Sequence, residues 1–448
     1  MSRNIQHYTP GPKVHAAPQK KASRKPIIIS FFVVLFLGAA VALYLPLRPQ
    51  YSESEKRELT KFPKFSFSAL ADGSYFNGIS TWYADTFPWR EMLLNADSKI
   101  KSFYGIGDTV SELPNLPADE IPDVKDVTVA PTKPNTQTTV PTTEDEAVDD
   151  SLIQKLGSVL IVDDSGYEYY NFNRSVADRY VVMVSKNADS LKGTARVFDI
   201  VVPTSTDITL SDQVRKGINS SSQSSAIDYI YAAISPNCIK VKTFEALRFH
   251  RKEYVYFRTD HHWTALGAYY AYREYAAAAG IRPAELTEFT ERKFDNFIGA
   301  FYNDSDKNKA LEKNPDTVYA YEPKATNSME FTNKDGKVIK WNIITDVSEW
   351  NRGSKYNAFI GGDNPYSHIT NPGVTDGSSC VVIKESFGNA FVPFLLANYS
   401  EIHVIDYRYW NGNLTQFVKS KGIQDVVFLN NISATRNSSL VKKMEGIT

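Results

Sequence analysis

Residues 380–399, CVVIKESFGNAFVPFLLANY, place one serine between a strand-like run and a helix-like run. The run CVVIKE (380–385) is apolar nearly throughout, as is typical of a strand covered on both faces. The segment NAFVPFLLANY (389–399) follows at once and has the character of a helix. Ser386 therefore lies at a strand-to-helix turn. In α/β proteins with a parallel sheet, the carboxyl edge of the strands is where sites are built.

Short apolar runs of the same kind recur along the C-terminal two thirds of the chain. Helix-like segments separate them, and the clearest is ALGAYYAYREYAAAA (265–279), which ends before Gly280. This alternation predicts an α/β fold, a three-layer α/β/α sandwich with a mainly parallel sheet. Residues 319–345 contain a hairpin pattern that turns at Asp335-Gly336, so we expect an antiparallel β-hairpin insertion there. The predicted strands are VLIV (159–162), VFDIVVP (197–203), YVYF (254–257), AFIGG (358–362), CVVIKE (380–385), IHVIDY (402–407) and DVVFLN (425–430).

Composition limits the classes of function. The 448 residues carry a formal net charge of −1, which gives no bulk electrostatic case for nucleic-acid binding. The chain has 26 Tyr, 25 Phe and 6 Trp, enough for a large core and for surfaces on which sugars stack. Its two cysteines, Cys238 and Cys380, are too few for a disulfide scaffold, and they form either one bond or buried free thiols.

The N-terminal region predicts export. Residues 1–26 contain lysines and arginines but no acid, and we interpret them as a basic cytoplasmic tail. The uncharged run at 27–45 is long enough to cross a bilayer, so we predict a single-pass transmembrane anchor with the rest of the chain outside the cell membrane. The alternative is a cleaved signal peptide, for which Ala40-Val41-Ala42 offers a cleavage site.

Three segments follow the predicted anchor. Residues 46–110 predict a juxtamembrane helical segment, with two short helices that meet at Pro88. Residues 111–150 are rich in Pro, Thr and acids and contain no aromatic residue, which is typical of a disordered linker. The globular pattern extends over 151–448, where we expect the functional domain.

A serine becomes a nucleophile when a base takes its proton and a third group orients the base. The segment RTDHHWTALGAYY (258–270) offers both groups, because Asp260 and His262 are two residues apart in a loop between a strand-like run and a helix. The simpler alternative is that Ser386 is an ordinary helix cap, and that Asp260 or Thr264 caps the second helix.

A metal site is another alternative, since adjacent histidines beside an aspartate resemble metal ligands. The remaining histidines do not support it, because they are scattered and form no H-x-x-x-H or H-E-x-x-H pattern. We therefore predict no metal and no cofactor. The histidines in question are His250, His368 and His403.

These motifs resemble a known family. TDHHWTALGAYYAY (259–272) resembles the signature of the DHHW family of exported bacterial proteins, and ESFGNAFVPFLLANYSEIHVIDYRYW (385–410) resembles its serine block. EKRELTKFPKFS (55–66) and WYADTFPWRE (82–91) resemble its N-terminal region. The family is similar to the SGNH-hydrolase-like proteins AlgJ and AlgX of alginate O-acetylation, which carry a D-x-H-W block and a later serine.

The resemblance implies that Ser386 is the nucleophile and that His262 and Asp260 form its dyad. It also implies a circular permutation of the SGNH-hydrolase fold, because the serine comes first in those enzymes and last here. Asn430 or Asn431 would then stand where those enzymes have the oxyanion-hole asparagine, although a strand-ending asparagine is also a common turn residue. Four further residues are candidates for oxyanion or substrate contact, or pack in the interior: Phe387, Arg408, Tyr409 and Trp263.

We therefore expect a membrane-anchored serine O-acetyltransferase that acts on a cell-envelope or secreted polysaccharide. The resemblance implies a multipass membrane protein as the acyl donor. One alternative is a polysaccharide deacetylase or acetylesterase, in which water accepts the acetyl group. Another is a non-catalytic polysaccharide-binding or assembly scaffold with the same fold, which is favoured by Glu385 standing where the family more usually has an aspartate.

Overall fold

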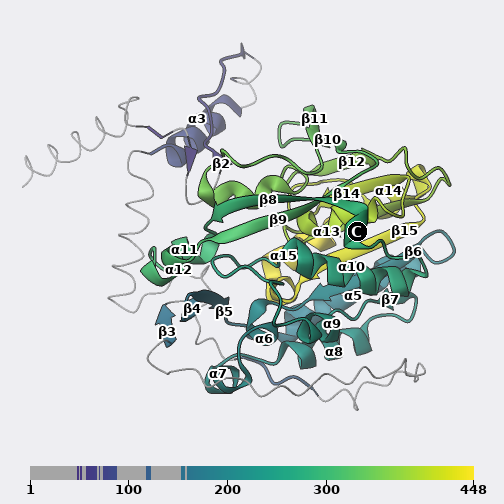
Figure 1. Ribbon diagram of the computed structural model, residues 1–448. Helices are drawn as coiled ribbons and strands as arrows, with labels where there is room; N and C mark the ends of the chain where they lie inside the picture. Colours follow the sequence, from purple (N-terminus) through teal and green to yellow (C-terminus); the bar gives the residue numbers. More distant parts are fainter. Residues whose placement is uncertain are drawn as a thin grey trace, which may run out of the picture. The chain divides into compact units, whose positions relative to one another are not determined.

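A computed structural model describes residues 48–49, 51–52, 57–67, 70, 74–87, 118–122, 153–156 and 159–448 (Figure 1). The chain divides into two compact units, Met1–Ile106 and Gly107–Thr448. The predicted cytoplasmic tail and the predicted anchor at 27–45 lie outside the described residues. None of the helices in the described part of the chain has the length and apolar character that a membrane span requires.

The first unit contains a small strand pair and one helix. Strands β1 (Tyr51–Ser52) and β2 (Arg57–Glu58) are antiparallel, and helix α3 spans Ser74–Asp85. Trp82 on α3 meets Phe62 edge to face, with ring centroids 4.8 Å apart, and the Arg48 guanidinium lies 4.0 Å from the Trp82 ring. Helix α3 lies within the predicted helical segment, whereas the second helix expected after Pro88 falls outside the described residues.

The second unit is built on an eight-stranded sheet, in the order β11-β10-β12-β14-β13-β15-β6-β7. From β14 to β7 neighbouring strands are parallel, and β12, β10 and β11 continue the sheet antiparallel. This confirms a mixed α/β fold with a large central sheet. The strands are β6 (Arg196–Val202), β7 (Cys238–Lys240), β10 (Ser328–Thr332), β11 (Val338–Asn342), β12 (Tyr366–Thr370), β13 (Ser379–Lys384), β14 (Glu401–Asp406) and β15 (Asp425–Asn431).

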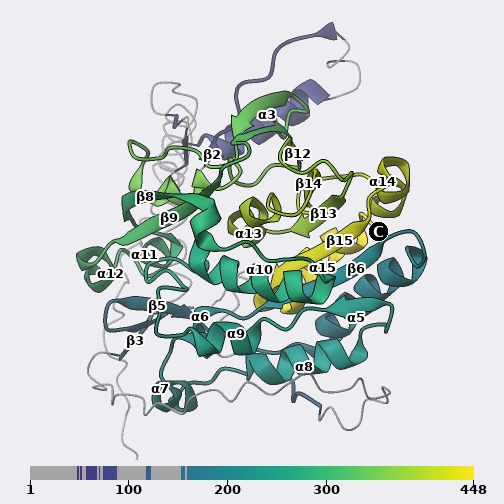
Figure 2. The ribbon, with the colours of Figure 1, turned by 45° about the vertical axis from the view of Figure 1, so that its right-hand side comes forward.

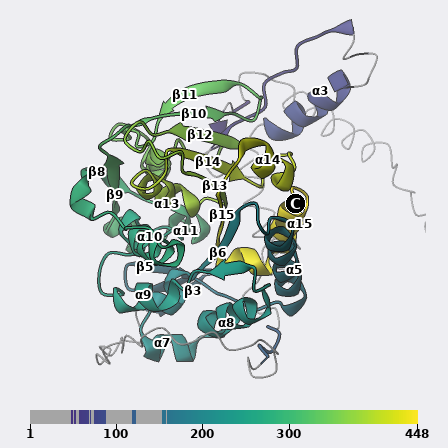
Figure 3. The same ribbon diagram turned by 90° about the vertical axis from the view of Figure 1, so that its right-hand side faces the viewer.

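Helices cover both faces of this sheet (Figure 3). Alternate side chains of β13 enter different cores, because Val382 belongs to one apolar cluster and Val381 and Ile383 to the other. One face carries α9 (Phe244–Phe249), α10 (Ala265–Ala279) and α13 (Gly388–Leu395), of which α10 and α13 are in contact (Figure 2). The other carries α5 (Arg174–Ser190), α8 (Gln223–Ala233), α14 (Leu414–Lys421) and α15 (Ser438–Glu445).

Smaller elements surround the sandwich. A three-stranded antiparallel sheet joins β3 (Ile153–Leu156), β4 (Val159–Val162) and β5 (Ser165–Glu168), and a separate pair joins β8 (Phe289–Phe297) and β9 (Asp316–Pro323). The short helices are α6 (Ser205–Ile208), α7 (Asp212–Gly217), α11 (Ala300–Asp304), α12 (Lys309–Lys313), η4 (Leu286–Glu288), η5 (Arg352–Ala358) and η6 (Ile432–Arg436).

Two predicted strands are wrong, and the predicted hairpin is part of the central sheet and not a separate insertion. YVYF (254–257) forms only an isolated bridge, Tyr256 to Trp263. In AFIGG (358–362), Ala358 ends η5, Phe359 forms an isolated bridge to Ile344, and a turn follows. Their apolar side chains are buried in the core without being paired in the sheet. The hairpin β10–β11 does form around its expected turn, but β10 pairs with β12, so it widens the central sheet.

Residues 118–122 are the described part of the stretch predicted as a linker. The Asp119 backbone N–H donates to the carbonyl of Phe172 over 3.0 Å, and the Arg174 N–H donates to Asp119 Oδ2 over 2.8 Å. Ile121 packs against the core on the α5 side of the sheet. These five residues are therefore held against the second unit by hydrogen bonds and packing. The rest of 111–150 lies outside the described residues.

Both cysteines are buried free thiols. Cys238 lies on β7 and Cys380 on β13, so they occupy different strands, and neither forms a disulfide. Burial raises the pKa of both thiols above its ordinary value. This environment keeps them protonated, as expected of inert core cysteines.

The buried Asp199 on β6 makes stability depend on pH. The Tyr180 hydroxyl donates to Asp199 Oδ1 over 2.6 Å, and Oδ2 has no hydrogen-bond partner within the described part of the chain. Burial raises the pKa of Asp199 to about 7. Between roughly pH 4 and pH 7 the folded protein therefore holds a proton that the unfolded chain, with an aspartate pKa of about 3.9, has lost. The contribution of Asp199 to the free energy of unfolding is fully present below that pH range and is lost as the pH rises through it.

We expect Asp199→Asn to raise the unfolding temperature at about pH 8 by about 5 °C, because the asparagine side chain is neutral and places no buried charge in the core. The gain should shrink or reverse near pH 4, where the wild-type carboxyl is protonated. Thermal unfolding followed by circular dichroism at both pH values tests this. An equal shift at both would show that the charge of Asp199 is not the cause.

Candidate functional site

Ser386, His262 and Asp260 form one continuous series of contacts. His262 Nε2 lies 2.7 Å from Ser386 Oγ, and His262 Nδ1 lies 2.5 Å from Asp260 Oδ1. Ser386 follows the carboxyl end of β13, whereas the other two lie in the loop before α10. His262 and Asp260 are buried and Ser386 is partly exposed. Folding thus brings the three residues predicted as a triad within hydrogen-bonding distance.

A buried carboxylate shapes the loop that carries Asp260 and His262. Asp316, at the start of β9, accepts hydrogen bonds from the backbone N–H groups of Arg258 and Thr259, over 3.0 and 2.7 Å. The Thr264 hydroxyl accepts from the Gly267 N–H over 3.3 Å and caps α10. Because Thr264 serves as the helix cap, the carboxylate of Asp260 is left to bind the imidazole.

The second oxygen of Asp260 is held by α11. The Ala300 N–H donates to Asp260 Oδ2 over 2.8 Å, while the His262 N–H donates to Oδ1 over 3.1 Å. Gly299 passes so close that a Cβ there would lie 2.1 Å from the Cβ of Asp260. Only a glycine permits this approach, so Gly299 is required by the packing around Asp260 and not by its backbone angles.

Substituting Gly299 by alanine is expected to push Asp260 away from His262 and to reduce any activity of Ser386 by at least about tenfold, since small displacements at a reacting site are costly. Gly217→Ala is the matched control, because its Cβ would meet no atom within 4 Å. Rates of ester hydrolysis and unfolding temperatures of both variants test this. Full activity of the Gly299 variant would contradict the proposed importance of the Asp260 position.

Aromatic side chains fix the plane of the His262 ring. Tyr356 stacks on it with ring centroids 3.9 Å apart and planes inclined by 15°, and the Phe387 ring lies 5.1 Å away. The Tyr356 hydroxyl also donates to the Ser386 carbonyl over 3.0 Å. Tyr356 therefore ties the base to the serine turn. It lies in η5, outside any motif, and the sequence offered no signal for it.

Glu385 organises the serine turn. Its Oε2 accepts a hydrogen bond from the Phe387 N–H over 3.0 Å, and its Oε1 accepts one from the Asn431 N–H over 3.0 Å. Oε2 also lies 3.1 Å from Ser386 Oγ. The single hydroxyl proton of Ser386 thus has two acceptors, His262 Nε2 and Glu385. The glutamate that departs from the family pattern is buried and bridges the ends of β13 and β15.

The other predicted contact residues are occupied elsewhere. Trp263 is fully buried and its Nε1–H donates to the Phe387 carbonyl over 2.9 Å, so of the two alternatives predicted for it the structure shows packing in the interior. Arg408 is paired with Asp406 and Asp363, at 2.6 and 2.8 Å, which explains its position without a substrate.

The asparagines at the end of β15 do not donate to Ser386. Asn430 is buried with its Nδ2 3.5 Å from the Tyr180 hydroxyl, on the side of the sheet that α5 covers, so its side chain gives no support to an oxyanion role. The side chain of Asn431 caps η6. Tyr409 lies beneath the Lys334 ammonium, which is 3.8 Å from its ring centroid.

A metal ion bound at this loop would need atoms that already make the contacts described above. Asp260, His261 and His262 place one ligand atom each within 4.8 Å of one another. Both nitrogens of His262 are already engaged, one by Asp260 and one by Ser386. An ion bound to either nitrogen would displace one of these contacts, so the arrangement favours acyl-transfer chemistry.

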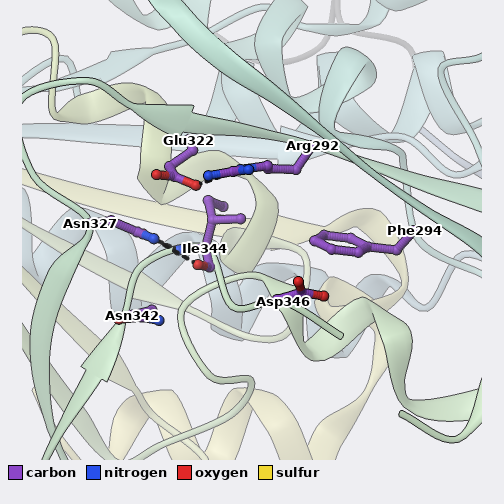
Figure 4. A pocket seen from close by; sticks show the side chains of 7 residues that line it. All are labelled: Arg292, Phe294, Glu322, Asn327, Asn342, Ile344 and Asp346. Atoms are coloured by element: carbon purple, nitrogen blue, oxygen red, sulfur yellow. Dashed lines mark hydrogen bonds and ion pairs between the residues drawn. The ribbon is translucent and has the colours of Figure 1, made fainter. Parts of the chain in front are cut away.

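A pocket of about 190 Å³ lies apart from Ser386, at the edge where β8 and β9 meet the hairpin β10–β11 (Figure 4). Several of its polar side chains are paired with each other or with the backbone. Arg292 meets Glu322 at 2.8 Å, and the Asn327 amide donates to the Ile344 carbonyl over 2.9 Å. The lining residues are Arg292, Phe294, Glu322, Asn327, Asn342, Ile344 and Asp346, none of which belongs to the serine site.

Comparison with known proteins confirms the family resemblance. The model of the DHHW protein family matches residues 55–132 and 125–405. A DHHW family protein from Eubacterium siraeum matches with a TM-score of 0.59 and 28% identity, covering 64% of this chain and 94% of that chain. PatB1 of Bacillus cereus, solved with a sulfonyl adduct, matches with a TM-score of 0.54 and 18% identity, covering 63% and 97%. The O-acetyltransferase domain of Pseudomonas putida AlgJ matches with a TM-score of 0.33 and 11% identity, covering 64% and 96%. A comparison with curated proteins gives no match.

Proposed function

Because this chain belongs to the DHHW protein family, we propose that it transfers an acetyl group to a polysaccharide with Ser386 as the nucleophile. The observation that carries the proposal is the 2.7 Å contact between Ser386 Oγ and His262 Nε2, with His262 Nδ1 held by Asp260. We infer the identity of the transferred group, acetyl, and of the acceptor, a polysaccharide, from the sequence resemblance described above. The parallel strand order β14-β13-β15-β6-β7, with the serine after β13, supports a circularly permuted SGNH-hydrolase-like domain.

The chemistry takes two displacements. Ser386 Oγ attacks the carbonyl carbon of the acetyl donor while its proton moves to His262 Nε2, and the proton then goes to the departing donor group. The resulting acetyl-serine is attacked by a sugar hydroxyl, whose proton is taken by His262 and returned to Ser386. Asp260 accepts a hydrogen bond from the Nδ1–H of His262, which fixes the tautomer and stabilises the imidazolium that forms in each step.

The surroundings of Glu385 favour a second candidate, a polysaccharide-binding scaffold without turnover. A tetrahedral intermediate needs donors aimed at its oxyanion. The Phe387 N–H, predicted for this role, donates to Glu385 Oε2, and the Asn430 side chain lies beside Tyr180. Acyl transfer through the Phe387 amide therefore requires Glu385 to release it. If it never does, the chain keeps the fold and the triad contacts but loses the catalytic advantage.

The N-terminal sequence supports the rest of the proposal. The basic tail at 1–26 and the apolar run at 27–45 favour a single-pass anchor with the serine domain on the outer side of the membrane. A multipass membrane protein is then the proposed acyl donor. No cofactor is required, since serine, imidazole and carboxylate complete the reaction.

Full-length protein incubated with p-nitrophenyl acetate, with and without a soluble oligosaccharide, tests the proposal. A transferase releases p-nitrophenol and acetylates the sugar, which mass spectrometry detects. An esterase releases p-nitrophenol and forms only acetate, and a scaffold releases nothing above background. Activity that a chelator removes and that survives Ser386→Ala would replace this proposal with a metal hydrolase.

A further inference from the structure

Two histidines that are far apart in the sequence form a cross-strand pair. His368 on β12 lies directly opposite His403 on β14 in the antiparallel register, and the strands are neighbours in the sheet (Figure 1). Their rings are stacked, with centroids 4.7 Å apart and planes inclined by 8°. The prediction treated these histidines as scattered, and the sheet brings them together.

Both rings direct an unsatisfied nitrogen toward one carboxylate. Among the described residues, neither His368 Nε2 nor His403 Nε2 has a hydrogen-bond partner, and both atoms are buried. Glu401 Oε2 lies 3.8 Å from the first and 3.7 Å from the second, too far for a hydrogen bond. Buried polar atoms are nearly always bonded, so two unsatisfied nitrogens facing one carboxylate require an explanation.

We propose that His368, His403 and Glu401 bind a divalent transition-metal ion of the zinc class. One ligand atom from each residue lies within 4.8 Å of the others. Imidazole nitrogens and a carboxylate oxygen are ligands that zinc accepts at about 2.0–2.2 Å, with a fourth tetrahedral position left for water. Such bonds place ligand atoms about 3.3 Å from each other and lie in the plane of each imidazole. The carboxylate must therefore approach by a few tenths of an ångström, and one of the two nearly parallel rings must turn toward the ion. Glu401 is about half exposed, with 50% of its side chain accessible, and can make that movement.

The surroundings of His403 suit a ligand. Its Nδ1 lies 2.7 Å from the Tyr366 hydroxyl, a contact that leaves Nε2 free to bind the ion when Nδ1 carries the hydrogen. The edge of Phe417 on α14 covers the ring at 5.4 Å.

The charges around the pair are net negative. Lys421 on α14 opposes a cation, and Glu401 provides the nearest negative charge. Glu330 on β10 lies opposite His368 in the register and adds a second acid to the same row. A divalent ion would therefore have one carboxylate within reach and a second acid on the same face of the sheet, against one ammonium group, an arrangement that does not repel it.

This site is separate from the serine site. His403 pairs with Val381 in the first half of β13, whereas Ser386 follows the carboxyl end of that strand. The pair joins the antiparallel strand β12 to its neighbour β14, which begins the parallel part of the sheet. A bound ion would therefore cross-link these strands and stabilise the sheet, independently of the acyl-transfer proposal.

Full-length protein that has been stripped with a chelator, titrated with ZnCl₂ by calorimetry and with CoCl₂ by visible absorption, tests the proposal. We expect one zinc per chain, a rise in unfolding temperature, and the cobalt spectrum of a four-coordinate site. His368→Gln and His403→Gln should each weaken zinc binding by more than about tenfold. His250→Gln is the matched control and should change nothing, because His250 stacks on Tyr270 away from this sheet pair.

Two results would overturn the proposal. One is the absence of saturable zinc binding by the stripped, folded wild type. The other is binding that persists in His368→Gln and is lost in His261→Gln, which would assign the ion to the loop before α10. If His403→Gln does not fold, His368→Gln still decides, since the His368 side chain is one-third exposed and its replacement is tolerated more easily. Ester hydrolysis by the metal-free protein reports on the serine site alone. It therefore shows whether the proposed function holds, independently of whether zinc binds.

Discussion

Replacing Ser386 by alanine is expected to reduce ester hydrolysis by at least about 10³-fold, because the variant has no oxygen to carry the acetyl group. The 2.7 Å contact with His262 and the 3.1 Å contact with Glu385 both end on this one hydroxyl. Its removal leaves only a small gap in a partly exposed turn, so the unfolding temperature should change little. Initial rates with p-nitrophenyl acetate and thermal unfolding measure both effects.

Ser190→Ala is the control for this experiment. Ser190 ends α5, is exposed, and donates to the carbonyl of Lys186 over 2.8 Å within its own helix. Its variant should keep the wild-type rate. Equal rates for wild type and Ser386→Ala would remove this serine from any catalytic account and leave hydrolysis to another group.

The second large effect is expected for Asp260→Asn, with kcat lowered by about 10²- to 10⁴-fold and KM nearly unchanged. The two oxygens of Asp260 accept from different donors, His262 on one side and Ala300 N–H on the other. An amide has only one oxygen. If the oxygen faces Ala300, the NH₂ group meets His262 Nδ1 and leaves the proton on Nε2, where it cannot accept one from Ser386. If the oxygen faces His262, two donors meet at Ala300 and the loop is strained.

A matched control is Asp295→Asn, since Asp295 is an exposed carboxylate that pairs with Thr317 and Lys293. It should retain full activity. Steady-state kinetics of both variants give the split between kcat and KM. An Asp260→Asn enzyme with wild-type kcat would mean that the carboxylate does not set the tautomer of His262.

Much of the fold could be predicted because the hydrophobic periodicity and the positions of turn-forming residues agree along the chain. The alternation of CVVIKE, IHVIDY and DVVFLN with helices identified β13, β14 and β15, and the Asp335-Gly336 turn identified the hairpin. The failures at 254–257 and 358–362 share one physical cause. An apolar run indicates burial, and a segment can be buried by packing under a helix without joining a sheet.

The triad contacts could be predicted from motifs, whereas their supports could not. Asp316, Gly299 and Tyr356 come from three other elements, and only the folded chain places them around Asp260 and His262. The same holds for His368 and His403, which become neighbours through the antiparallel register of β12 and β14. Spacing along one strand cannot reveal a partner on another. The family resemblance identified the serine, but it gave no indication that Glu385 engages Phe387 and Asn431.

Covalent labelling with an aromatic sulfonyl fluoride tests the central claim most directly. The 2.7 Å contact between Ser386 Oγ and His262 Nε2 predicts that this serine reacts with such a reagent. Peptide mass spectrometry should find a single sulfonyl group on Ser386, formed at least about tenfold more slowly in His262→Gln because the base is missing. An unmodified Ser386 peptide from folded protein, or equal labelling of both proteins, would contradict the claim that His262 activates this serine.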